Sequence, residues 1–269
     1  MLKKSEVILL TLIIFLCFFA MTLPSPVIAS AFLSTNFHIP YIFHNFSTKT
    51  NIAFILASYP LGLFLGSSVF GFLSDFLNRK YLLTCGLLLA GIMQLLSGKF
   101  IEDRVFVYLL ISRIFSGLFE GSIVIARTVL TTSYKTEDKK IKQVSNSNAA
   151  LTLGWIIGPL LGGIFSNPKI FYFFNASTPF YLGGCLSLCT VIIIFFYLNG
   201  SHMIVLNKSI ELSQSTHSRT LFNNKNILKL LICTLLITLG VDFFYQNMPV
   251  FLVSEYNYSP FIVGSTLSL

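Results

Sequence analysis

The chain has 269 residues, of which 54% are hydrophobic and only 10% are charged. This excludes an ordinary soluble domain, in which about 25% of residues are charged. The net charge of +8 does not indicate nucleic-acid binding, because the lysines and arginines lie in short connectors and not on one basic face.

Long stretches without charged residues run through the chain. Asp, Glu, Lys and Arg are absent from residues 7–48, 50–74, 81–98, 143–168 and 170–207. Each stretch is long enough for one or more membrane spans of about 20 apolar residues. The sequence therefore predicts an all-α, polytopic membrane protein.

We expect six spanning helices within residues 1–198. They lie near 7–23, 51–72 and 81–99, followed by a fourth that begins after Arg104, a fifth that begins after Lys142, and a sixth near 175–198. Pro24 and Pro26 interrupt the outer end of the first helix, a feature of helices that line a membrane cavity.

A second group of helices is expected after a polar connector. Residues 199–226 are predicted to form a central cytoplasmic loop, and residues 227–269 hold a seventh helix near 227–253 and the start of an eighth. The segment 258–269 is too short to cross a bilayer as a helix. We therefore expect the second group to be truncated.

The distribution of Lys and Arg predicts the orientation of the helices. Most of these residues lie in the connectors on the side of the N-terminus, including Lys139, Lys140 and Lys142 in an expected loop over 133–142. Positive charge is enriched in cytoplasmic loops. The N-terminus is therefore expected in the cytoplasm, and the protein in a bacterial cytoplasmic (inner) membrane.

The segment Leu153–Phe165 reads LGWIIGPLLGGIF and carries unusually many glycines. A spacing of four residues places them on nearly one helix face, where another backbone can approach closely, and the proline is expected to bend the helix. The pattern resembles the fifth-helix antiporter motif of the major facilitator superfamily. Its fixed positions are Gly154, Gly158, Pro159, Gly162 and Gly163. A closely packed helix pair in an unrelated membrane protein is the alternative.

The segment 71–80, between the second and third helices, resembles a loop motif of the same superfamily. The matching residues are Gly71, Leu73, Ser74, Asp75, Arg79 and Lys80. Phe76 stands where the motif has a basic residue, and Asn78 stands where it has a glycine. Asparagine tolerates a left-handed backbone better than most residues, so we expect the turn to be kept. The alternative is an ordinary polar loop with basic residues at the cytoplasmic face.

Three charged residues in the fourth helix are the candidates for transport chemistry. Arg113, Glu120 and Arg127 are seven residues apart, so on a continuous helix they share one face and rise about 10 Å per step. Arg113 with Gly117 resembles the fourth-helix motif of the superfamily, whose arginine is associated with proton coupling. Arg113 either acts in coupling or braces neighbouring helices, Glu120 is either a protonatable site or a counter-charge, and Arg127 is expected to be structural.

A short internal repeat supports this resemblance. Residues 61–66 read LGLFLG and residues 153–158 read LGWIIG, in the second and fifth helices. These positions are equivalent if helices one to three and four to six are inverted repeats, as in each half of a major facilitator protein.

The resemblance implies secondary active transport by alternating access, in particular efflux of a small organic compound against entering protons. Arg113, with Glu120 or Asp242 of the seventh helix, would form the proton and substrate site. Asp75 and Arg79 would form a cytoplasmic latch to the second half, and the glycine-rich fifth helix would be the sliding surface between the halves. The alternative is a non-transporting remnant, or a half-transporter that needs a complementary half.

Catalysis and metal binding are not predicted. The five cysteines and four histidines show no zinc-ligand spacing, and no nucleophile–base constellation is present. The cysteines fall in apolar segments and are expected to be buried. Aromatic residues such as Tyr59 are expected to face lipid or pack in the core, and the expected partners are the lipid bilayer, protons and a small-molecule substrate.

Overall fold

The computed structural model describes residues 4–34, 37–134, 136–168, 170–198 and 225–268 and is all-helical. Within these residues, seven helical segments are long and apolar enough to cross a membrane. They are α1 (Lys4–Thr22) with α2 (Ser25–Ser34), α4 (Thr48–Leu73), α5 (Arg79–Glu102), α6 (Phe106–Glu120) with α7 (Ile123–Thr132), α8 (Glu137–Phe165), α9 (Thr178–Tyr197) and α11 (Lys225–Tyr256). Shorter helices are α3 (Tyr41–His44) and α12 (Pro260–Leu267). Nearly all of the expected loop 199–226 lies outside the described residues.

Two of the spanning segments are interrupted. The first breaks between Thr22 and Ser25, where the prolines are expected to disturb it. The fourth breaks at Gly121–Ser122, between α6 and α7, which the sequence did not predict. Glu120 and Arg127 therefore lie on either side of a break and not on one continuous helix.

The fifth spanning helix begins earlier than expected. It starts at Glu137, so the prediction of a loop up to Lys142 is wrong for the second half of that segment. Acidic residues in the first turn favour a helix N-terminus, and Lys140 forms an ion pair of 2.8 Å with Glu137 within this turn. Pro159 lies inside α8, and the bend expected there stays a prediction.

Glycines allow close contacts between two pairs of helices. A Cβ atom at Gly62 or Gly66 of α4 would overlap the backbone of α6, and one at Gly154 or Gly162 of α8 would overlap the backbone around α1. The second spanning segment thus packs on the fourth, and the fifth packs on the first. The predicted inverted repeat relates these two contacts to each other, so the packing supports it.

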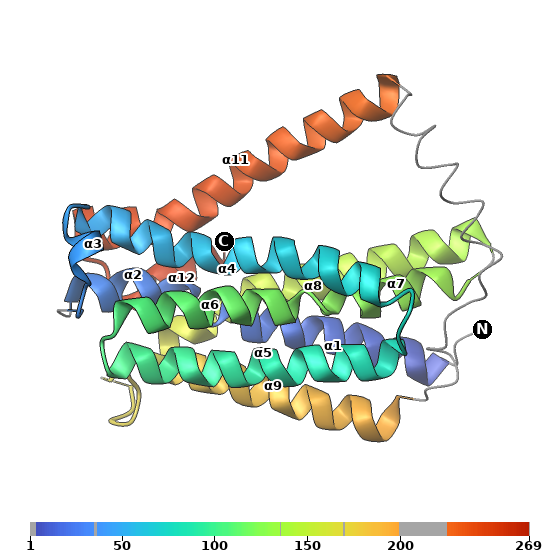
Figure 1. The fold of residues 1–269 in the computed structure, drawn as a ribbon, viewed down its shortest axis with the longest axis horizontal. Helices are drawn as coiled ribbons and strands as arrows, with labels where there is room; N and C mark the ends of the chain where they lie inside the picture. Colours follow the sequence, from blue (N-terminus) through green and yellow to red (C-terminus); the bar gives the residue numbers. More distant parts are fainter. Residues whose placement is uncertain (1–3, 35–36, 135, 169, 199–224, 269) are drawn as a thin grey trace.

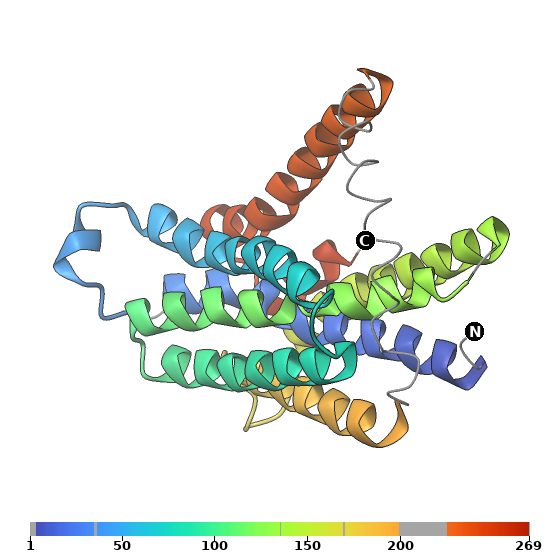
Figure 2. The same ribbon diagram turned by 45° about the vertical axis from the view of Figure 1, so that its right-hand side comes forward.

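The helix α11 leans away from the other helices at the end of the molecule near the N-terminus (Figures 1 and 2). Its first two-thirds are largely exposed. At the opposite end, Leu252 and Val253 are buried against Ala29 of α2 and Val263 of α12. The bundle and the second helix group are therefore in contact at one end and separated at the other.

The cysteines differ in burial. Cys17 is buried, as expected. The prediction is wrong for the other four, which lie on exposed helix surfaces: Cys85, Cys185, Cys189 and Cys233. In a membrane-spanning segment, the residues that face lipid and those that face the core are both apolar. The sequence of such a segment therefore does not show which cysteines are buried.

Candidate functional site

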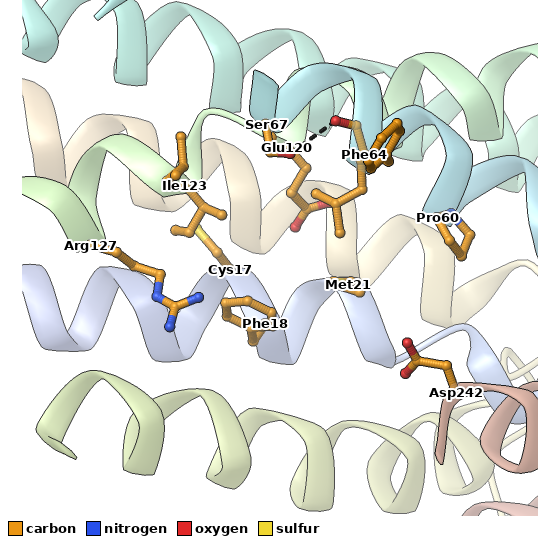
Figure 3. Close-up of a pocket in the computed structure, with 13 residues that line it drawn as sticks. Cys17, Phe18, Met21, Pro60, Phe64, Ser67, Glu120, Ile123, Arg127 and Asp242 are labelled. Atoms are coloured by element: carbon orange, nitrogen blue, oxygen red, sulfur yellow. Dashed lines mark hydrogen bonds between the residues drawn. The ribbon is translucent and has the colours of Figure 1, made fainter. Parts of the chain in front are cut away.

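A cavity of about 370 Å³ lies between the N-terminal bundle and α11. Three charged side chains line it from three different helices: Glu120 at the end of α6, Arg127 of α7 and Asp242 of α11 (Figure 3). The remaining walls are mainly apolar, including Phe18 and Met21 of α1. Charged groups inside a membrane normally face a wet cavity or each other. The structure therefore brings together two of the three predicted coupling residues, Glu120 and Asp242.

Glu120 is held by a tyrosine from the neighbouring helix α4. The Tyr59 hydroxyl donates a hydrogen bond of 2.7 Å to the Glu120 carboxylate. Both side chains are buried, with exposed fractions of 3% for Tyr59 and 5% for Glu120. A hydrogen bond to an ionised acceptor is stronger than one between neutral groups, so Tyr59 fixes the carboxylate at the cavity edge.

Arg113 lies on the other side of the same tyrosine. Its guanidinium stacks over the Tyr59 ring at 4.4 Å and approaches the Phe180 ring at 5.7 Å, geometries that stabilise a cation. Its Nη1 donates a hydrogen bond of 3.4 Å to Gln94 of α5. Arg113 forms no ion pair with an acidic residue of the described segments. Arg113 and Glu120 therefore do not touch each other, but both contact Tyr59, Arg113 at the ring and Glu120 at the hydroxyl.

Gln94 extends this buried polar group. Its Oε1 also accepts a hydrogen bond of 3.1 Å from Ser116, and its Nε2 donates one of 3.5 Å to the carbonyl of Ala20. The group thus links α1, α4, α5 and α6 in the interior. Sequence analysis missed Gln94 and expected Tyr59 to be an ordinary apolar-segment aromatic. A glutamine in an otherwise apolar spanning helix is the signal that could have identified Gln94.

Arg127 has a different environment. Its Nη2 donates a hydrogen bond of 3.1 Å to Asn148 of α8, at the surface. This contact ties α7 to α8, in agreement with the structural role expected for Arg127. Because its side chain also lines the cavity, it contributes positive charge opposite Asp242.

A larger cavity of about 850 Å³ adjoins the first along α11. Asp242, Met21, Pro60 and Leu63 line both. The larger cavity also has walls from Trp155 of α8 and other apolar side chains. Such a space, mostly apolar with a few polar groups, is typical of a small-molecule site.

The predicted loop motif lies apart from these cavities. Arg79 Nη2 is 4.0 Å from Asp75 Oδ1, and Arg79 Nε donates a 3.4 Å hydrogen bond to the Ser74 carbonyl. Lys80 Nζ donates a 3.0 Å hydrogen bond to the Phe195 carbonyl of α9. Gly71, where the motif begins, has open space around it. These contacts stay within the N-terminal bundle, so the expected latch to the second half stays a proposal.

Asn78 does not adopt the left-handed backbone expected for it. Its φ is −63° and its ψ is 116°, and its side chain accepts a 3.0 Å hydrogen bond from the Lys80 amide. It is the N-cap of α5. An asparagine is favoured at this position because it satisfies an amide that has no partner within the helix.

The superfamily glycines of α8 face two different neighbours. Gly154, Gly158 and Gly162 pack against α1 and the residues that follow it, within the N-terminal bundle, whereas Gly163 packs against the start of α12. The carbonyl of Pro159 contacts Gly264 of α12. Of the glycines in the motif, only Gly163 has its nearest neighbours in the second helix group.

The sequence pattern of the Major Facilitator Superfamily matches residues 10–269. The chain belongs to the major facilitator superfamily. Because this is a family of transporters, the chain is a multi-pass integral membrane protein and not an enzyme.

Curated relatives are distant. An MFS-type transporter of Methanocaldococcus jannaschii is 27% identical over 177 residues, which are 66% of this chain and 43% of that protein. The quinolone resistance protein NorA of Staphylococcus aureus is 23% identical over 213 residues, 79% of this chain and 52% of NorA. The chain thus spans about half the length of these relatives.

Solved structures of low sequence identity share the fold. A bacterial homologue of the human lysosomal transporter Spinster, in an inward-facing and unoccupied conformation, has a TM-score of 0.71 at 15% identity and covers 98% of this chain and 58% of that one. A D-xylose–proton symporter has a TM-score of 0.61 at 15% identity and covers 98% of this chain and 65% of the symporter. Both confirm the all-helical major facilitator fold.

Proposed function

We propose that this chain forms the N-terminal half and the beginning of the C-terminal half of a proton-coupled exporter of small organic compounds. Residues 1–198 would be the six-helix bundle, 199–226 the central loop, and 227–269 the start of the second bundle. Protons and substrate would bind in turn at the cavity between them. The observation that carries this proposal is the cavity lined by Glu120, Arg127 and Asp242 from three helices.

The buried carboxylate of Glu120 suits a proton carrier. It combines a cavity edge, where a proton can arrive, with a hydrogen bond from Tyr59 that holds the carboxylate in place. Protonation removes a charge from an apolar environment, which favours rearrangement of the helices around it. Arg113, on the opposite face of Tyr59, supplies a fixed positive charge to the same helix pair.

The separation of α11 from the bundle near the N-terminus (Figures 1 and 2) supports a state of the alternating-access cycle that is open at this end. Lys and Arg concentrate in the connectors at this end, which favours a cytoplasmic location. On this orientation the separated ends of α11 and the bundle face the cytoplasm (Figure 1), and the contact between α2, α11 and α12 lies on the outer side. A bacterial cytoplasmic membrane is the proposed location.

Transport by the full chain in proteoliposomes tests the proposal. NorA is described as a quinolone resistance protein, so a fluorescent quinolone is a suitable first probe. With an acidic interior, a proton antiporter takes the quinolone up as protons leave. We expect Glu120→Gln to abolish this pH-driven uptake, while Asp103→Asn, an exposed acid outside the cavities, leaves it unchanged.

Where the wild type takes up quinolone, alone or with a complementary half, equal uptake by Glu120→Gln would contradict the proposed coupling role. The alternatives of a half-transporter and a non-transporting remnant are tested by co-expression with a complementary second half from a related transporter. Uptake only with the second half identifies a half-transporter. No uptake in either case, with folded protein in the membrane, favours the remnant.

A further inference from the structure

A third, much smaller cavity of about 40 Å³ lies beside Arg113. Its polar lining comes from both helix groups: Thr22, Ser25, Tyr59, Arg113 and Trp155 of the N-terminal bundle, and Tyr245 and Gln246 of α11. The Trp155 and Tyr245 rings are packed with their centroids 5.0 Å apart. Glu120 and Asp242 do not line this cavity. It adjoins the acidic cavity, with which it shares Met21 and Pro60, but has no carboxylate in its own lining.

Two buried N–H donors at this cavity lack acceptors. Arg113 Nε and Trp155 Nε1 have no hydrogen-bond partner among the residues that the structure describes. Arg113 as a whole is 5% exposed, and no carboxylate in the described ranges lies within ion-pair distance of it. A buried donor without a partner costs about 1–3 kcal/mol. Such a site is complementary to an anionic acceptor.

The dimensions limit the acceptor to a compact group. By the measure in which one water needs about 10–15 Å³, the cavity holds about three water-sized atoms, the size of a carboxylate. Its walls continue into the larger cavity of about 850 Å³, because Leu56, Pro60 and Trp155 line both. A molecule with an acidic group and an apolar body can therefore occupy the two spaces together.

We propose that Arg113 and Trp155 bind the carboxylate of an organic acid whose apolar body lies in the larger cavity. This deepens the proposed function by naming the substrate class, although binding can be measured without transport. Tyr245 places α11 against the bound group, so the ligand contacts both halves. An inorganic anion such as chloride offers the same charge without the apolar body, and the experiment separates these two sources.

Trp155 is the only tryptophan of the chain, so its fluorescence reports directly on this site. The purified 269-residue chain is titrated with 4-phenylbutyrate, with its neutral amide, and with chloride. We expect a saturable change with 4-phenylbutyrate and an affinity at least about tenfold weaker for the amide, which lacks the charge. Chloride is expected to bind more weakly than 4-phenylbutyrate, because it does not fill the larger cavity.

Variants of two arginines provide the matched comparison. Arg113→Gln is expected to remove the preference for the carboxylate over the amide, and Arg113→Lys to restore part of it. Arg104→Gln, in an exposed connector outside the cavities, is expected to keep the wild-type preference. Circular dichroism and thermal unfolding establish which variants are folded before binding is compared.

Three results would overturn the inference. Equal affinity for 4-phenylbutyrate and its amide in the wild type excludes an anion site. Preservation of the preference in folded Arg113→Gln, or in folded Arg113→Lys and Arg113→Gln alike, excludes the role of the guanidinium. Equal affinity for chloride and 4-phenylbutyrate assigns the site to inorganic anions and excludes the organic acid.

Discussion

The hydroxyl of Tyr59 donates a 2.7 Å hydrogen bond to the carboxylate of Glu120, across the contact between α4 and α6. The ring of the same tyrosine supports the guanidinium of Arg113. One neutral side chain therefore stands between two buried charges that form no direct ion pair. Substitutions can remove the hydroxyl of Tyr59 alone, or the hydroxyl together with the ring.

Tyr59→Phe removes the hydroxyl and keeps the ring. We expect a loss of about 1–3 kcal/mol in the free energy of unfolding, because a buried carboxylate loses its donor. Tyr59→Ala also removes the ring under Arg113 and is expected to cost more, about 3–5 kcal/mol. Thermal unfolding in detergent measures both. Tyr81→Phe, at an exposed position of α5, is the control, and an equal effect of Tyr81→Phe and Tyr59→Phe would contradict the expectation.

Gly162→Ala tests the contact between α8 and the residues after α1. The added Cβ would overlap the carbonyl oxygen of Leu23, and overpacking of this kind costs about 1–3 kcal/mol or more. We expect a lower unfolding temperature and less folded protein in the membrane. Gly71→Ala adds the same methyl group where nothing lies within 4 Å and is expected to be tolerated. If both variants behave alike, the close contact at Gly162 is not formed.

Asn78 offers a test of the N-cap. Asn78→Ala removes the acceptor for the Lys80 amide and is expected to reduce stability by about 0.5–2 kcal/mol. Asn78→Gly, which introduces the residue of the superfamily motif, is expected to cost only a few tenths of a kcal/mol. Thermal unfolding measures both variants, and we expect a lower unfolding temperature for Asn78→Ala than for Asn78→Gly. A more damaging glycine than alanine would indicate that the side chain does not cap α5.

An ion pair of 2.8 Å joins Lys49 of α4 to Glu255 of α11 at the closed end of the molecule. Because both side chains are more than half exposed, we expect Lys49→Glu to change stability by less than about 1 kcal/mol. Repulsion across the contact is nevertheless expected to shift spin labels at Phe46 and Tyr256, in a chain freed of its native cysteines, to longer distances.

The charge-swapped variant is the control for this ion pair. Lys49→Glu combined with Glu255→Lys restores the opposite charges and is expected to restore the wild-type distance distribution. If the single and the swapped variants both keep the wild-type distribution, the ion pair does not contribute to closure of this end.

The helices and their glycine contacts could be predicted from the sequence because apolar runs and four-residue spacings are local signals. The superfamily motif in α8 and the heptad of Arg113 and Glu120 depend on the same kind of signal. The N-cap at Asn78 could also have been predicted, since an asparagine before an apolar helical run indicates a helix start. The motif has a glycine at this position, so the expectation concerned the backbone conformation of Asn78 and not its side chain.

The polar connections within the bundle could not be predicted in this way. Tyr59 is one of 11 tyrosines, and only the packing of α4 on α6 places its hydroxyl at Glu120. The break at Gly121–Ser122 lies where α6 contacts α4, and a Cβ at Gly121 would overlap Gly66 and Ser67; this contact is also not visible in the sequence. Arg113 Nε and Trp155 Nε1, which lack acceptors among the described residues, come together at one cavity only when α6, α8 and α11 are assembled.

The glycine-rich helix α8 has one face in its own bundle and another against α12. Thr22 donates a 3.0 Å hydrogen bond to the Gly154 carbonyl on the first face, which anchors α8 to α1. At Gly163, backbone meets backbone without interlocking side chains. We therefore propose that one face of α8 is fixed to its own bundle, while the other face forms the surface on which the second half can move.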